Sequence, residues 1–257
     1  FKEEYQKLWQ LFAVEKIIYN SGYYCTLAEY IDETYFRDLD FRGTFIKIYD
    51  MMHELGLNAT PPDDVKYLFR FCEFLIAALD DEKSYKWPKI EKQRDTIFDN
   101  IVYILHETNH NMTKDAYGRT IIIEEKPEAT LAAEIVEDTH DAYDILEYNH
   151  FALKGHLEEK RKILSALAFH IEQELKFSEF PECSKLKDNI KFLVNRFNIR
   201  HNITDDKHAS SVIKSLTNDE LEEWYDIAYQ LIITFYVVDK YQEIKSSIED
   251  IKKAIDS

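Results

Sequence analysis

Glycine and proline are scarce in this chain of 257 residues, with five of each. Tight turns, phosphate-cradling loops and strand-rich folds depend on these two residues. No glycine-rich nucleotide fingerprint and no phosphate-binding loop occurs, which argues against a nucleotide-dependent enzyme of the usual kinds. The composition therefore favours long helices joined by few, short breaks.

Cysteine and long apolar runs are scarce as well. The three cysteines, Cys25, Cys72 and Cys183, stand singly without paired spacing, which fits a reducing cytoplasm. The longest mainly apolar run, Leu231 to Val238, is far shorter than the ~20 residues that a bilayer requires. We expect a cytoplasmic protein with no membrane span and no cofactor.

Basic residues are outnumbered, with 32 Lys and Arg against 49 Asp and Glu, which gives a net charge of −17. Such a charge repels nucleic acid and anionic membranes on average. Residues 151–207 depart from this balance, because they hold eleven Lys or Arg and nine Asp or Glu. If RNA is a partner, we expect it to bind in this part of the chain.

Apolar residues recur at intervals of three and four along most of the chain, which predicts helices. One short β segment is expected at 119–124. The predicted class is all-α: a multi-helix protein with a C-terminal four-helix-bundle-like unit. We expect an N-terminal helical regulatory or interaction region at 1–118 and the bundle at 119–257. The expected helices cover 1–19, 27–52 with an irregular middle, 63–79, 88–112, 127–153 with a break near Asp138, 156–177, 185–200 and 218–255.

A first candidate site is the segment His106-Glu107-Thr108-Asn109-His110. On a helix, His106 and His110 lie one turn apart and both reach one Zn²⁺, while Glu107 activates the bound water. The segment resembles the gluzincin peptidases, whose third ligand comes from a downstream Glu-x-x-x-Asp, the form of Glu134 to Asp138 here. The alternative is an ordinary amphipathic helix with both histidines on its flank.

A second candidate site lies in the segment 195–202, where Arg196 and His201 have Arg-x4-His spacing. This spacing, after one helix and before a long C-terminal one, resembles the HEPN superfamily of small helical bundles. The stretch from Glu147-Tyr-Asn-His150 through residue 202 resembles its abortive-infection members, bacterial proteins that restrict phage or act as toxins.

The resemblance implies metal-independent RNA cleavage by a homodimer that brings two such motifs together. The arginine stabilises the charge that develops on the phosphate, and the histidine moves a proton to or from the 2′-hydroxyl or the leaving oxygen. Either Arg196 or Arg200 is the working cation beside His201, with Asn198 and Asn202 as polar neighbours.

Noncatalytic interpretations stay open. Arginine and histidine are favoured at a helix C-terminus, where they bond the last carbonyls and meet the negative end of the helix dipole. The strong negative charge also fits a noncatalytic helical interaction protein with a protein partner at its N-terminal region. The charge-poor run Leu231 to Val238 is a candidate dimer or interdomain surface.

Histidines recur in the C-terminal half without ligand spacing, and three aspartates surround the first of them. A metal site of carboxylate and imidazole ligands is one interpretation. We expect instead that these groups are charges on helix surfaces. The residues concerned are His140, His150, His156, His170, Asp138, Asp141 and Asp144.

Overall fold

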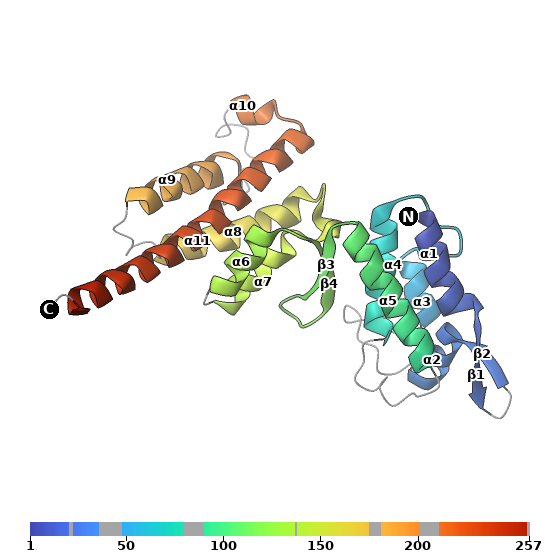
Figure 1. The fold of residues 1–257 in the computed structure, drawn as a ribbon. Coiled ribbons are helices and arrows are strands. Elements are labelled where there is room, and N and C mark those ends of the chain that lie inside the picture. The colour runs from blue at the N-terminus through green and yellow to red at the C-terminus, as the bar shows by residue number, and fades with distance from the viewer. Residues whose placement is uncertain are drawn as a thin grey trace. The chain divides into compact units, whose positions relative to one another are not determined.

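The computed structural model describes residues 1–20, 23–35, 48–79, 90–136, 138–174, 181–200 and 211–255. The chain divides into two compact units, the first of residues 1–114 and 118–124 and the second of 115–117 and 125–257. Helices dominate both units (Figure 1), so the predicted all-α class is confirmed. No helix within the described ranges combines the length and the apolar content that crossing a bilayer requires.

The first unit is built around α4, in which ten of the fifteen residues are buried. Phe12 packs edge-on against Phe74 of α4, with 5.6 Å between ring centroids. The elements of the first unit are α1 (Lys2–Trp9), the π-helical turn η1 (Gln10–Val14), β1 (Lys16–Asn20), β2 (Tyr23–Thr26), α2 (Leu27–Tyr35), α3 (Ile48–Glu54), α4 (Val65–Leu79), α5 (Glu91–Glu107), β3 (His110–Lys114) and β4 (Thr120–Glu124).

Two hairpins, β1–β2 and β3–β4, give more β structure than the single segment expected. The first replaces the end of the helix predicted at 1–19, and pairs Ile17 with Cys25. The β-branched pair Ile17-Ile18 and the tyrosines of β2 favour a pleated conformation, which explains the difference.

The second hairpin replaces the end of the helix predicted at 88–112. Asn109 takes a left-handed conformation, with φ of 57°, and this ends α5 at Glu107. The buried Glu73 carboxylate of α4 then accepts the Ile122 N–H at 2.8 Å. Both strands therefore belong to the first unit, and the division falls after Glu124 instead of between 118 and 119.

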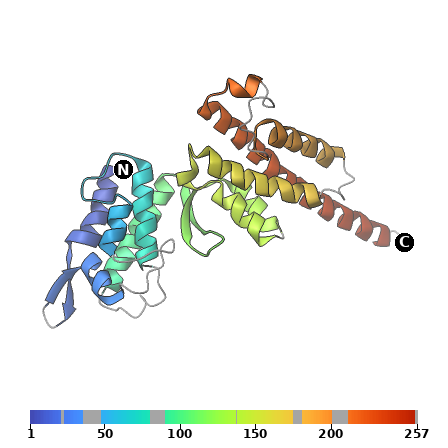
Figure 2. The same ribbon diagram turned by 180° about the vertical axis from the view of Figure 1, so that it is seen from behind.

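The second unit is a helical bundle organised along α11, which packs against α6, α8 and α9 (Figures 1 and 2). The predicted break near Asp138 is confirmed, because Asp138 accepts the His140 and Asp141 N–H groups and caps α7. The elements of the second unit are α6 (Pro127–Ile135), α7 (Thr139–Glu147), the 3₁₀ turn η3 (Phe151–Leu153), α8 (Leu157–Glu174), α9 (Pro181–Arg196), α10 (Ser211–Lys214) and α11 (Asn218–Ile255).

The run Leu231 to Val238 lies in this bundle, where Ile232, Ile233 and Phe235 are buried in the core. The expectation of a dimer or interdomain surface there is therefore wrong, because the charge-poor stretch of α11 is the one that the other helices cover. Nearby, the Tyr229 hydroxyl donates to the Ile145 carbonyl at 2.7 Å, and its ring stacks on Tyr148.

Candidate functional site

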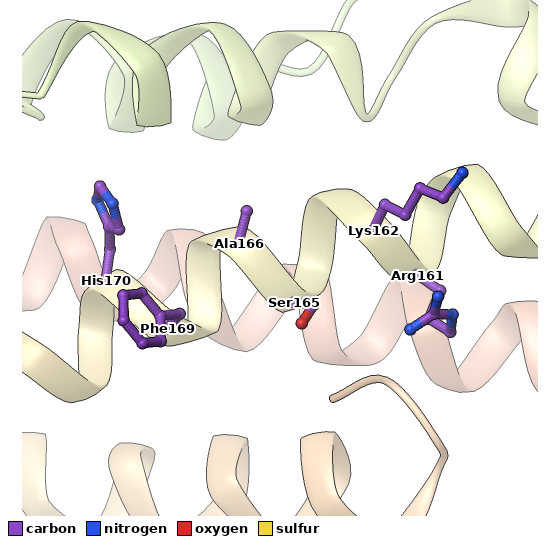
Figure 3. A pocket seen from close by; sticks show the side chains of 6 residues that line it. All are labelled: Arg161, Lys162, Ser165, Ala166, Phe169 and His170. Atoms are coloured by element: carbon purple, nitrogen blue, oxygen red, sulfur yellow. The ribbon is translucent and has the colours of Figure 1, made fainter. Parts of the chain in front are cut away.

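One open groove of about 500 Å³ runs along α8, and Figure 3 shows the side chains that line it. The lining residues repeat at intervals of four, which places them in two adjacent rows of the same helix face. Leu164, Leu167 and Ile171, on the opposite side of α8, are buried in the bundle core. The groove is lined by Arg161, Lys162, Ser165, Ala166, Phe169 and His170.

The groove combines basic side chains with an exposed aromatic ring. Lys162 and His170 project to one side of α8 and Arg161, Ser165 and Phe169 to the other (Figure 3). Phe169 is 55% exposed. Cationic side chains beside an exposed ring can hold a phosphate and stack a base, the two contacts that single-stranded nucleic acid offers.

Arg161 joins the groove to the segment that follows α9. Its Nη1 donates to the Ile199 carbonyl at 3.2 Å, while its Nε and Nη2 bond both oxygens of Glu158, at 2.9 and 2.6 Å. Glu158 raises the pKa of Arg161, so the guanidinium stays charged. The fork geometry of arginine therefore fixes the end of α9 against α8.

The structure gives the residues after α9 distinct environments. Phe197 is buried and lies 4.8 Å from the Trp224 ring, and Ile199 is fully buried. Between them, Asn198 takes a left-handed conformation with φ of 59°, which ends the helix. Asn198 therefore has a backbone role that is independent of any chemistry.

The two candidate arginines differ from each other. Arg196, the last residue of α9, is exposed. Arg200 is partly buried, and its guanidinium forms an ion pair with Glu172 of α8. Its backbone N–H donates to the Val194 carbonyl at 3.1 Å. The remaining candidates, His201 and Asn202, lie outside the described residues.

The structure does not place the two histidines of the zinc-peptidase segment on one helix. His106 is in the last turn of α5 and its side chain is 85% exposed, whereas His110 is in strand β3. The expected one-turn spacing is wrong, because the left-handed Asn109 ends the helix between the two histidines. The third expected ligand, Glu134, is on α6 in the other unit.

His110 has structural partners of its own. Its Nδ1 donates to the Thr108 carbonyl at 2.7 Å, and its ring lies 4.3 Å from that of Phe69. Burial lowers the pKa of His110, which favours the neutral ring. These contacts give His110 a structural role. The alternative of two histidines on the flank of one helix is also wrong, because His110 lies in β3.

A different group of possible metal ligands, Asp138, Asp141 and His170, lies between α7 and α8. The expectation of surface charges is wrong for Asp141 and Asp144, which are both buried. Sequence spacing does not reveal this group, since His170 comes from another helix. A signal was nevertheless present: Asp141 and Asp144 fall three residues apart and share the apolar face of α7 with Ile145.

Comparison of the chain with protein-family models, with curated proteins and with solved structures finds no match.

Proposed function

We propose that the second unit binds single-stranded RNA along the groove of α8 and cleaves it with His201 and one arginine, Arg196 or Arg200. The observation that carries the proposal is the bond from Arg161 in the groove to the Ile199 carbonyl, two residues before His201. A strand stacked on Phe169 would thus run toward the segment that resembles the HEPN motif. By the same resemblance, the proposal includes a phage-defence or toxin setting for this activity.

The chemistry needs no bound metal. A histidine with a pKa near neutrality exchanges a proton with the 2′-hydroxyl or the leaving oxygen, and an arginine stabilises the negative charge on the phosphate. Arg196 is the better candidate for this cation, because it is exposed whereas Arg200 already neutralises Glu172.

Support for the homodimer comes from the far end of α11, where the helix extends beyond its packing partners (Figures 1 and 2). Large exposed side chains follow there at alternating intervals of three and four, the spacing of a coiled-coil seam. A second copy of the same helix matches this spacing, so we assign the stripe to self-association. The stripe consists of Tyr241, Ile244, Ile248, Ile251 and Ile255.

The test uses a fluorescent single-stranded RNA in EDTA, with anisotropy for binding and gel electrophoresis for cleavage. We expect Phe169→Ala to weaken binding about 5- to 150-fold, since stacking a base on an aromatic ring contributes roughly 1–3 kcal/mol. Phe192→Ala is the matched control, because Phe192 is 58% exposed and does not line the groove. Equal binding by the two variants would exclude the groove as the RNA site.

Cleavage is tested separately. We expect His201→Ala to abolish cleavage and leave binding intact, whereas Ile248→Asp should halve the mass measured by light scattering and reduce cleavage. Ser246→Asp, an exposed position off the stripe, controls for the added charge. Normal cleavage by His201→Ala rejects the catalytic assignment, and a chain that binds no RNA supports the noncatalytic interaction protein instead.

A further inference from the structure

The group of Asp138, Asp141 and His170 joins the start of α7 to α8. One possible ligand atom from each residue lies within 4.8 Å of those from the other two. His170 Nδ1 is 2.9 Å from Asp141 Oδ2, a separation that suits two ligands of one ion as well as a hydrogen bond. From this group we infer a binding site for a divalent transition-metal cation, a site that the proposed RNA chemistry does not require.

The Asp141 carboxylate gives an independent reason to expect an ion. Only 2% of its side chain is exposed, and the Tyr236 hydroxyl donates to its Oδ2 at 2.7 Å. Its other oxygen, Oδ1, is buried and has no hydrogen-bond partner among the described residues. A buried carboxylate oxygen without a partner is costly, and a cation in this group would supply the missing interaction.

Asp138 is arranged to provide a second carboxylate ligand. Its Oδ1 accepts the His140 and Asp141 N–H groups, at 2.7 and 3.2 Å, which fixes the orientation of the side chain. These backbone bonds hold the carboxylate at the start of α7, within reach of Asp141 and His170. The side chain is exposed, which gives an ion a route into the group from solvent.

The chemistry of the ligands selects the class of metal. Two carboxylates and one imidazole combine oxygen ligands with a borderline nitrogen ligand, a set that suits Zn²⁺ or Mn²⁺ better than Ca²⁺. The two negative charges also match a divalent cation when the imidazole is neutral. Three protein ligands leave a coordination position for water.

The experiment is a calorimetric titration of the EDTA-treated full chain with ZnCl₂ and, separately, with MnCl₂ at pH 7.5. We expect one ion to bind with a Kd below 100 µM and to raise the melting temperature. Asp138→Asn is the most informative variant, because asparagine also caps helices and preserves the start of α7 while it removes the carboxylate. We expect this variant and His170→Gln to weaken binding tenfold or more.

Two controls make the assignment specific. His156→Gln changes an exposed histidine in the same unit that lies outside the group, and His106→Gln tests the competing HExxH segment. Both variants should bind the metal as the unaltered chain does. Each of three results would overturn the inference: the unaltered chain binds no metal, the variants Asp138→Asn and His170→Gln bind it as tightly as the unaltered chain, or His106→Gln loses binding. The RNA assay in EDTA is unaffected by any of these results.

Discussion

Replacing Asp144 with asparagine should change how the stability of the protein depends on pH. Asp144 is on α7 with 11% of its side chain exposed, and His140 Nε2 lies 4.0 Å from its Oδ2. Burial raises the pKa of Asp144 from 3.8 to about 6. The folded state therefore binds a proton that the unfolded state has released, and stabilisation by protonated Asp144 is complete below pH 4 and lost as the pH rises through 6.

The size of the effect follows from this shift. A change of one pKa unit corresponds to 1.36 kcal/mol, so the full contribution is about 3 kcal/mol. Between pH 4.5 and pH 7.5, the unaltered protein should lose about 2 kcal/mol of unfolding free energy relative to Asp144→Asn. Asparagine keeps the shape of the side chain but does not ionise, so the difference between the two proteins isolates this one group.

Urea denaturation at both pH values, in EDTA, measures the difference in unfolding free energy between the two proteins. The protein concentration is kept low because the pI is about 5.0. Asp188→Asn provides the control, since Asp188 is an exposed aspartate on α9. We expect its stability to follow that of the unaltered protein at both pH values. A free-energy difference for Asp144→Asn that is the same at pH 4.5 and 7.5 would refute the reasoning.

Two other substitutions test single features of the bundle. Lys160 is buried, and its ammonium lies 2.8 Å from Glu222 and 2.7 Å from Asp226. Lys160→Met should therefore lower the free energy of unfolding by about 3 kcal/mol, measured by urea denaturation. Lys162→Met, at an exposed position, should lower it by less than about 0.5 kcal/mol. Similar costs for both would contradict this. Asn198→Ala should destabilise by about 1 kcal/mol because of the positive φ, whereas Asn198→Gly should retain both stability and RNA cleavage. Loss of cleavage in the glycine variant would show that the amide takes part in the chemistry.

Periodicity was sufficient to predict the helices that pack through one long apolar stripe. The spacing of apolar residues along α4 and α11 identified both helices, and Asp138 marked the break between α6 and α7 because its carboxylate caps the second. The β1–β2 hairpin was missed because apolar residues in a short segment fit a helix and a strand equally well. The end of α5 was missed because asparagine takes the left-handed conformation only in some contexts.

The candidate sites depended more on tertiary contacts than on spacing. The zinc-site interpretation of residues 106–110 requires a continuous helix, and Asn109, which has a positive φ, interrupts that helix. Residues 195–202 were identified by spacing and by resemblance to a family, whereas the groove, which Arg161 joins to Ile199, comes from a face of α8 that contains no recognisable motif. His170 and Asp141 are 29 positions apart in the sequence, and only the packing of α7 on α8 brings them together.

The ion pairs show that the near-neutral charge of residues 151–207 reflects cations that pair with carboxylates of the bundle more than cations available to RNA. Arg161 is bonded to Glu158, Lys160 to Glu222 and Asp226, and Arg200 to Glu172, so these cations hold the bundle together. Among the residues that line the groove, Lys162 is the exposed lysine. An RNA bound there would depend on stacking against Phe169 more than on phosphate contacts. For this reason Phe169, and not the count of basic residues, is the position that decides whether the groove binds RNA.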